Sequence, residues 1–139
     1  MQTIVCAVDE SPGAAEAVSV AAGLSKDLRL RLVLAHVVDG HRRTNGVGMG
    51  SVQARQGGQR LLERVAVNHS LESASDRRAE VGDRVSELSR IAGEEAAVVI
   101  VVGSRSRHRR RRNLVSRLSA ELRSTAPCPV VVVPPRPRR

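Results

Sequence analysis

The stretch over residues 98–134 constrains the fold more than any other part of this 139-residue chain. It opens with an apolar run rich in β-branched residues, V-V-I-V-V, which breaks at Gly103 into a turn of small and basic residues. An amphipathic segment and a second apolar run, A-P-C-P-V-V-V-V, follow. A wholly apolar strand that leads through a helix into another apolar strand is typical of a parallel sheet buried on both faces. Ligands of such sheets bind beyond the carboxyl ends of the strands, so the turn after Gly103 is where function must be sought.

The rest of the chain repeats this alternation. Strands are predicted at residues 3–8, 28–38, 77–81, 96–102 and 130–133. Four helices are predicted. The first begins at Ser11 and Pro12, and the second follows a glycine-rich mobile loop over residues 39–58. The third begins at Asp83 and the fourth at Asn113. Because crossovers of helical length join the strands, we expect one doubly wound, Rossmann-like parallel sheet of five strands with helices on both faces. One domain over residues 1–135 and a short basic tail at 136–139 account for the length.

Composition narrows the chemistry. The chain has no Phe, Tyr or Trp, so aromatic stacking on bases or sugars is excluded. Residues 103–139 carry eleven arginines and one acid, whereas the first 102 residues are close to neutral. The densest basic run comprises Arg107, Arg109, Arg110, Arg111 and Arg112. This run is either a solvated loop or a contact for a polyanion such as nucleic acid, polyphosphate or an acidic protein.

The cysteines and the apolar runs indicate the cellular compartment in which the protein is expected. Cys6 and Cys128 fall in or beside predicted strands and belong to no metal-binding spacing, so both are expected to be buried free thiols. If a third strand lies between the strands of these two cysteines, their backbones lie about 10 Å apart, beyond the reach of a disulfide. The sequence has no charged and apolar leader and no apolar run near the ~20 residues of a membrane span, which predicts a cytoplasmic protein.

Five segments, in order along the chain, resemble the universal stress protein family. They are I-V-C-A-V-D-E-S from Ile4, L-V-L-A-H-V-V from Leu32, V-G-D from Val81, V-V-I-V-V-G-S-R from Val98 and A-P-C-P-V-V-V-V from Ala126. The resemblance implies a five-stranded parallel sheet of the adenine nucleotide alpha hydrolase-like class. It also implies a homodimer paired through the last strand, a stress or regulatory role, and adenine nucleotide binding in some members.

The nucleotide-binding members carry G-x-x-G, nine residues, then Gly and Ser or Thr. In this chain the four positions are Gly103, Ser106, Ser116 and Arg117, so three have changed. The resemblance also implies a nucleotide contact for Asp9 and an adenine-pocket lining for Val37. The serines, beside an arginine run, could still hold an anion; alternatively, their Cβ atoms fill the space for phosphate and oppose a left-handed backbone. We favour the second alternative, with ATP binding weakened or absent and no cofactor required.

Catalysis finds no support in the sequence. No Walker-type phosphate loop, nucleophile elbow or zinc-protease motif is present. His36 lies on a predicted buried strand and is best explained as a core histidine that is satisfied by the fold. The sequence therefore predicts a non-enzymatic protein that acts by binding and dimerisation. The alternatives are an ATP-binding switch that uses Asp9, Gly103, Ser106 and Ser116, and a polyanion binder that uses the arginine run.

Overall fold

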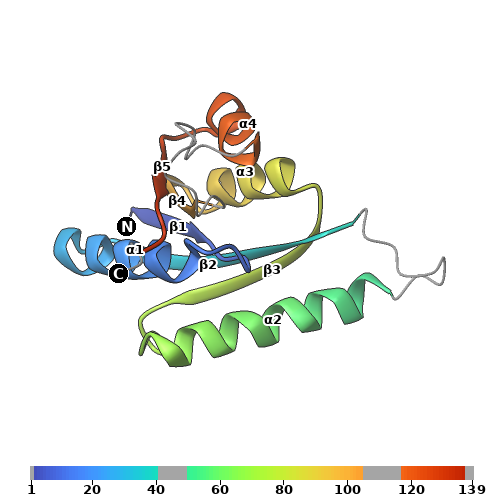
Figure 1. Cartoon of the computed structure of the whole chain (residues 1–139), viewed down its shortest axis with the longest axis horizontal. Helices are drawn as coiled ribbons and strands as arrows, with labels where there is room; N and C mark the ends of the chain where they lie inside the picture. Colours follow the sequence, from blue (N-terminus) through green and yellow to red (C-terminus); the bar gives the residue numbers. More distant parts are fainter. Residues whose placement is uncertain (1, 41–49, 105–116, 137–139) are drawn as a thin grey trace.

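The computed structural model describes residues 2–40, 50–104 and 117–136, which form one parallel sheet with helices on both faces (Figure 1). The sheet has the order β3-β2-β1-β4-β5 and all four strand pairs are parallel. Its strands are β1 (Thr3–Ala7), β2 (Arg31–Asp39), β3 (Asp76–Gly82), β4 (Ala97–Gly103) and β5 (Val130–Val133). The helices are α1 (Ala14–Leu28), α2 (Ser51–Asn68), α3 (Arg84–Glu94) and α4 (Arg117–Thr125). The predicted doubly wound sheet of five strands is confirmed.

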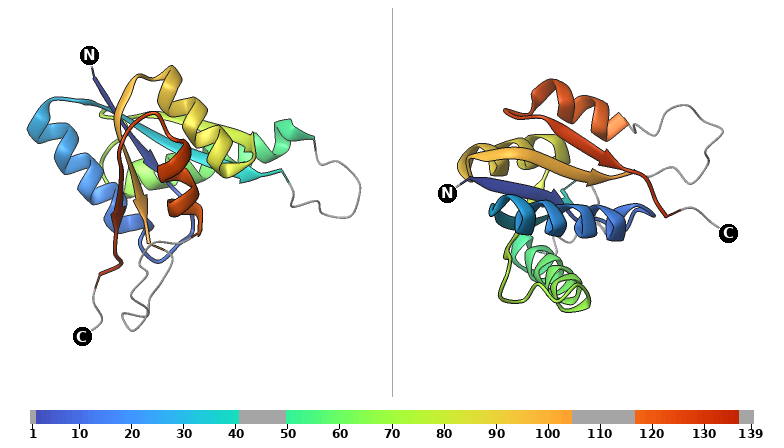
Figure 2. Two further views of the ribbon diagram at one scale, coloured as in Figure 1. Left: turned by 90° about the horizontal axis from the view of Figure 1, so that it is seen from above. Right: turned by 90° about the vertical axis from the view of Figure 1, so that its left-hand side faces the viewer.

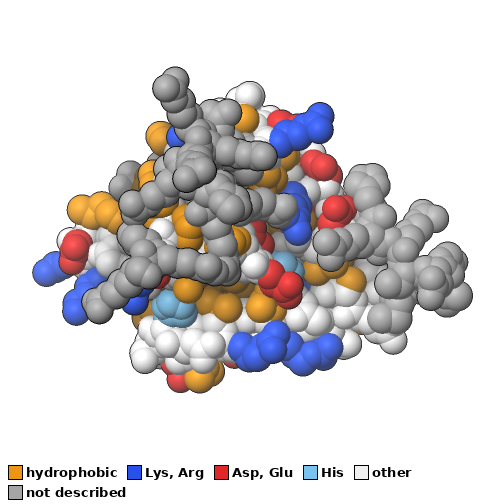
Figure 3. Space-filling model, in the orientation of Figure 1, with side chains coloured by type: hydrophobic (Ala, Val, Ile, Leu, Met, Phe, Trp, Pro, Cys, Tyr) orange, Lys and Arg blue, Asp and Glu red, His pale blue; other side chains and the backbone are white. Residues whose placement is uncertain are grey.

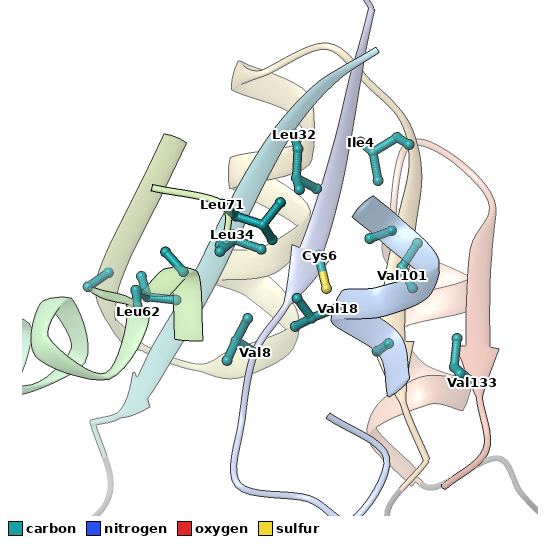
Figure 4. Packing of buried hydrophobic residues seen from close by; sticks show 14 residues of the cluster. Ile4, Cys6, Val8, Val18, Leu32, Leu34, Leu62, Leu71, Val101 and Val133 are labelled. Atoms are coloured by element: carbon teal, nitrogen blue, oxygen red, sulfur yellow. The ribbon is translucent and has the colours of Figure 1, made fainter. Parts of the chain in front are cut away.

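The sheet separates two apolar clusters. Alternate residues of β1 point to opposite faces, with Ile4 and Cys6 on one side and Val5 on the other. The first cluster packs against α1 and α2, and Figure 4 shows Val18 and Leu62 of these helices facing the strands. The second cluster packs against α3 and α4, which lie on the opposite side of the sheet (Figure 2). Aliphatic side chains fill both clusters, as the absence of aromatic residues requires.

The start of α1 corrects the prediction. The helix begins at Ala14 with Gly13 at its N-cap and no side-chain cap. Ser11 and Pro12 were expected to start the helix, but they form the turn before it. The side chain of Asp9 accepts a hydrogen bond from the backbone N–H of Ser11 at 2.8 Å, which closes this turn. The hydrogen bond to the Asp9 carboxylate thus holds the backbone of Ser11 in a turn that precedes the helix.

The predicted loop over residues 39–58 is also partly wrong. The strand β2 extends through Asp39, and α2 already begins at Ser51. Two adjacent glycines, Gly57 and Gly58, favour a loop in the sequence but lie inside the helix. A Cβ on Gly58 would lie 3.0 Å from the Cβ of Ala79 and 3.2 Å from His36. Gly58 is therefore explained by the close approach of α2 to the sheet.

Other local predictions hold. Asp83 caps α3 by accepting a hydrogen bond from the backbone N–H of Ser86 at 3.0 Å. The strand β4 lies between β1 and β5, so a third strand does separate the strands of the two cysteines, which was the condition for excluding a disulfide between them. Cys6 is fully buried and Cys128 only partly, and both are free thiols. The predicted cap Asn113 lies outside the described residues. Within the described part of the chain, no helix combines the length and apolar character needed to cross a membrane.

Candidate ligand site at the carboxyl ends of the strands

The order of the strands reverses between β1 and β4, and this switch point is where doubly wound sheets bind their ligands. Cys6 pairs with Val101, so the two strands end at the same level of the sheet. Asp9 follows β1 by two residues and Gly103 is the last residue of β4. The topology therefore brings these two predicted site residues to one edge of the sheet.

Backbone packing closes the base of this switch point. The N–H of Gly13 donates to the carbonyl oxygen of Ser104 at 3.1 Å, and the N–H of Ser104 donates to the carbonyl oxygen of Val133 at 2.8 Å. A Cβ on Gly103 would lie 2.5 Å from the carbonyl carbon of Gly13. A Cβ on Gly13 would lie 2.6 Å from the nitrogen of Ser104. Both glycines are thus needed for the segment before α1 to contact the end of β4.

Sequence reasoning missed Gly13 and Ser104 as parts of this contact. Ser104 is fully buried. The signal was present in the sequence, because Gly13 is the only glycine between β1 and the body of α1. A glycine just before a helix that packs on a parallel sheet can mark a close approach to a neighbouring strand.

Asp9 has both a structural and an electrostatic effect. Its side chain holds the turn at Ser11, and the carboxylate is only partly buried. Burial raises the pKa of the Cys6 thiol to about 12, and the negative charge of Asp9 adds to this effect. Cys6 therefore stays protonated and unreactive at neutral pH. The hydroxyl of Ser11 is buried and has no hydrogen-bond partner among the described residues.

The end of β2 is joined to the end of β1. The N–H of Val8 donates to the carbonyl oxygen of Ala35 at 2.7 Å. The Nδ1 atom of His36 lies 2.6 Å from the carbonyl oxygen of Val8, so Nδ1–H donates to this oxygen. His36 is thus satisfied within the fold, as expected. Val37 is 5% exposed, and its side chain packs in the cluster beneath α3.

The remaining predicted residues divide into two groups. Ser106, Ser116 and the arginine run from Arg107 to Arg112 lie outside the described residues. Arg117 begins α4, where its side chain is 93% exposed and lies 3.3 Å from Glu121. In residues 2–40, 50–104 and 117–136, no group of three or more His, Cys, Asp or Glu side chains could hold a metal ion. The roles of these residues in binding nucleotide stay predictions.

The fold and the switch point define a doubly wound α/β domain of the kind that binds ligands at the carboxyl ends of its strands. A family model, the universal stress protein family, matches residues 1–134. The chain belongs to this family, as the sequence motifs predicted. The comparison with curated proteins finds no match.

Solved structures agree with this assignment. A universal stress protein family member from Burkholderia pseudomallei is 28% identical with a TM-score of 0.71, and the match covers 96% of each chain. A universal stress protein in complex with cAMP is 18% identical, with a TM-score of 0.71 over 95% of this chain and 96% of that one. The universal stress protein from Archaeoglobus fulgidus in complex with dAMP is 17% identical, with a TM-score of 0.63 over 96% and 98%. The likeness to the last two shows the fold.

Proposed function

We propose that this chain is a regulatory protein of the stress response that acts by binding and by association of two copies, without catalysing a reaction. In this proposal ATP binding is weak or absent, and no cofactor is required. One observation carries the proposal. Gly103, which alone keeps its residue among the four motif positions, packs so closely on Gly13 that any side chain would clash. Packing alone therefore explains why position 103 is glycine, and contact with a nucleotide is not needed to explain it.

The three changed positions support the same conclusion. Ser106 and Ser116 add a Cβ atom where the family motif has glycine, and serine adopts positive φ poorly. Arg117 replaces the hydroxyl that would donate a hydrogen bond to phosphate. An arginine can attract an anion by charge, but it does not reproduce a short hydroxyl donor held close to the backbone. We therefore expect the site to hold a triphosphate poorly.

The competing function is an adenine nucleotide switch. It is supported by the two solved family structures in complex with cAMP and dAMP, and by the retained Asp9. In that function Asp9, Ser106 and Ser116 would contact the nucleotide, and Val37 would line the base. The neighbouring arginines would hold the anion by charge, in place of the backbone amides that hold it in the glycine motif.

Calorimetric titration with ATP and Mg²⁺ separates the two functions. We expect the wild-type protein to bind more weakly than about 1 mM. The triple variant S106G/S116G/R117S restores the motif and is expected to bind at micromolar strength. The variant S70G is a matched control, because Ser70 is exposed, has φ of 57° and lies outside the motif. Micromolar binding by the wild type would contradict the proposal and establish the competing function.

A second candidate function is polyanion binding by the arginine run, which the net charge of residues 103–139 favours. The test is retention on duplex DNA or polyphosphate at increasing salt. If this function holds, replacing Arg109–Arg112 by alanine abolishes a salt-sensitive affinity. Unchanged affinity in that variant would show that the run is a solvated loop.

A further inference from the structure

We propose that the outer side of α2 is a docking surface for an acidic segment of a partner protein. The surface, called here the α2 ridge, consists of Gln53, Gly57, Arg60, Arg64 and Val67. Gln53, Arg60 and Val67 are spaced by seven residues, so they recur on one side of the helix every two turns. Figure 3 shows Lys and Arg side chains gathered along α2. The surface is separate from the switch point and goes beyond the proposed function.

The two arginines of the ridge carry charge that no described acidic residue pairs with. Arg60 and Arg64 are exposed, lie one turn apart and make no ion pair with any described residue. The adjacent acid, Glu63, already pairs with Arg77 at 2.8 Å. Like charges four residues apart disfavour a helix by a few tenths of a kcal/mol, about 0.2–0.5. The pair thus costs stability and gains nothing within the described fold.

A glycine deepens the surface beside these arginines. Gly57 lies one turn before Arg60, and a Cβ placed there would meet only the guanidinium of Arg60, at 3.9 Å. Unlike Gly58, it is therefore not required by packing, although glycine inside a helix costs about 1 kcal/mol relative to alanine. The bare backbone leaves an open depression of about 580 Å³, lined by Gly57, Arg60, Glu63 and Arg64. A carboxylate can enter this depression and meet both guanidinium groups.

The composition of the ridge favours an acidic protein segment over a nucleic acid. Val67, on the ridge, is 57% exposed, and Val52, at the start of the helix, is 63% exposed. The lining also includes Glu63, whose carboxylate is already paired with Arg77. Two cations flanked by amide and apolar side chains match the mixed surface of a protein partner. Nucleic acids instead require many cations, because each contact with phosphate is electrostatic.

The test uses a fluorescein-labelled helical peptide with pairs of glutamates four residues apart, flanked by leucines. Binding to the full chain is followed by fluorescence anisotropy. We expect the double variant R60A/R64A to bind the peptide at least about ten-fold more weakly than the wild type. The matched control K26A/R123A removes two exposed charges on α1 and α4 and is expected to stay within about two-fold. G57L keeps every charge, fills the depression and is expected to weaken binding by about five-fold.

Several outcomes would overturn the proposal. They are no binding of the peptide by the wild type, equal binding by R60A/R64A, and an equal loss in K26A/R123A. Equal binding of a peptide in which lysine replaces glutamate would also overturn it. A 20-base-pair DNA duplex is titrated in parallel. If DNA binds more tightly than the peptide and loses that affinity in R60A/R64A, the ridge is a polyanion site instead. Nucleotide titrations do not enter this test, so it stands apart from the proposed function.

Discussion

The two edges of the sheet are built from opposite kinds of residue. The edge strand β3 has the sequence D-R-R-A-E-V-G, and each of its four charged residues lies in an ion pair. The edge strand β5 is four consecutive valines, of which Val131 is 39% exposed. Charged side chains on an edge strand oppose pairing with another chain, whereas a bare apolar edge permits it. Among the described residues, the difference makes β5 rather than β3 the edge at which the predicted pairing of two copies is to be tested.

The ion pairs of β3 also take the place of apolar packing between this strand and α3. On the side of α3, Arg78 and Glu80 occupy positions where a central strand would bury apolar side chains. Arg78 lies 3.1 Å from Glu80, 2.9 Å from Glu94 and 3.1 Å from Glu95. Arg31 on β2 extends the network to Asp76 at 2.7 Å. Charge pairing therefore joins β3 to α3, whereas packing of valines joins β5 to its neighbours.

The largest effect is expected from proline at the β5 edge. Ile100 N–H donates to the carbonyl oxygen of Pro129, and Ser104 N–H donates to that of Val133, so the alternate residues Val130 and Val132 point their backbone groups outward. V132P removes an outward N–H without removing a bond to β4. We expect a wild-type dimer and a dissociation constant about 100-fold weaker in V132P, measured by sedimentation equilibrium.

The matched control for this comparison is V132T, which keeps the N–H and nearly the same shape, and which should remain a dimer. A wild-type protein that is monomeric at micromolar concentration would contradict pairing through β5. So would a V132P variant that dimerises as tightly as the wild type. Either result would leave the difference between the two edges without a role in assembly.

A smaller effect is expected at the opposite edge. R78A leaves Glu80, Glu94 and Glu95 close together without their shared cation. The side chain of Arg78 is 21% exposed, so we expect a loss of about 2 kcal/mol in the free energy of unfolding, below the 3–5 of fully buried pairs. Urea unfolding measures the loss. The control is R117A, whose side chain is 93% exposed and which should cost less than about 0.5 kcal/mol. Equal losses would show that the network contributes no more than a surface pair.

The contrast between the edges also explains what the sequence could predict. The four valines of β5 and the apolar run of β4 identify their strands, because a strand that is buried on both faces has a continuous run of apolar residues in its sequence. β3 was found only weakly, over residues 77–81, because its charged residues face an ion-pair network rather than a core. Two partners of Arg78, Glu94 and Glu95, lie at the end of α3, 16 and 17 residues away in sequence, so no local pattern reveals them.

The candidate site shows a similar division. Sequence spacing placed Asp9 and Gly103 at one edge of the sheet, because parallel strands carry their carboxyl ends to the same side. It did not reveal that Gly103 contacts Gly13, since that contact depends on the position of the segment before α1. The prediction of a cap at Ser11 failed for a local reason. The carboxylate of Asp9, two residues earlier, takes the Ser11 N–H into a turn.

A still smaller effect concerns acid stability at the β3 edge. Hydrogen bonds from Arg90 and Arg78 lower the pKa of Glu94 below its ordinary value of 4.5. A carboxyl group whose pKa is lowered in the folded protein stabilises the fold above its ordinary pKa, and this contribution is lost as the pH falls through the folded value. We expect the melting temperature of E94Q to fall less steeply than that of the wild type below about pH 4.5. Parallel curves would contradict a role for this charge, and S124A, at an exposed position of α4, is the control.

The smallest effect on stability is expected from Arg55, the residue of α2 that contacts the ion-pair network. Arg55 on α2 lies 3.4 Å from Glu80, and its side chain is 51% exposed, so R55A should cost about 0.5 kcal/mol or less. Glu80 keeps its contact with Arg78 in this variant, at 3.1 Å. The double variant R55A/R78A should therefore lose more than the sum of the two single losses, because Glu80 then loses both of these cations. Urea unfolding of the four proteins measures this coupling. Strict additivity would show that α2 and α3 contact β3 independently, and that the charged edge is a set of separate pairs rather than one network.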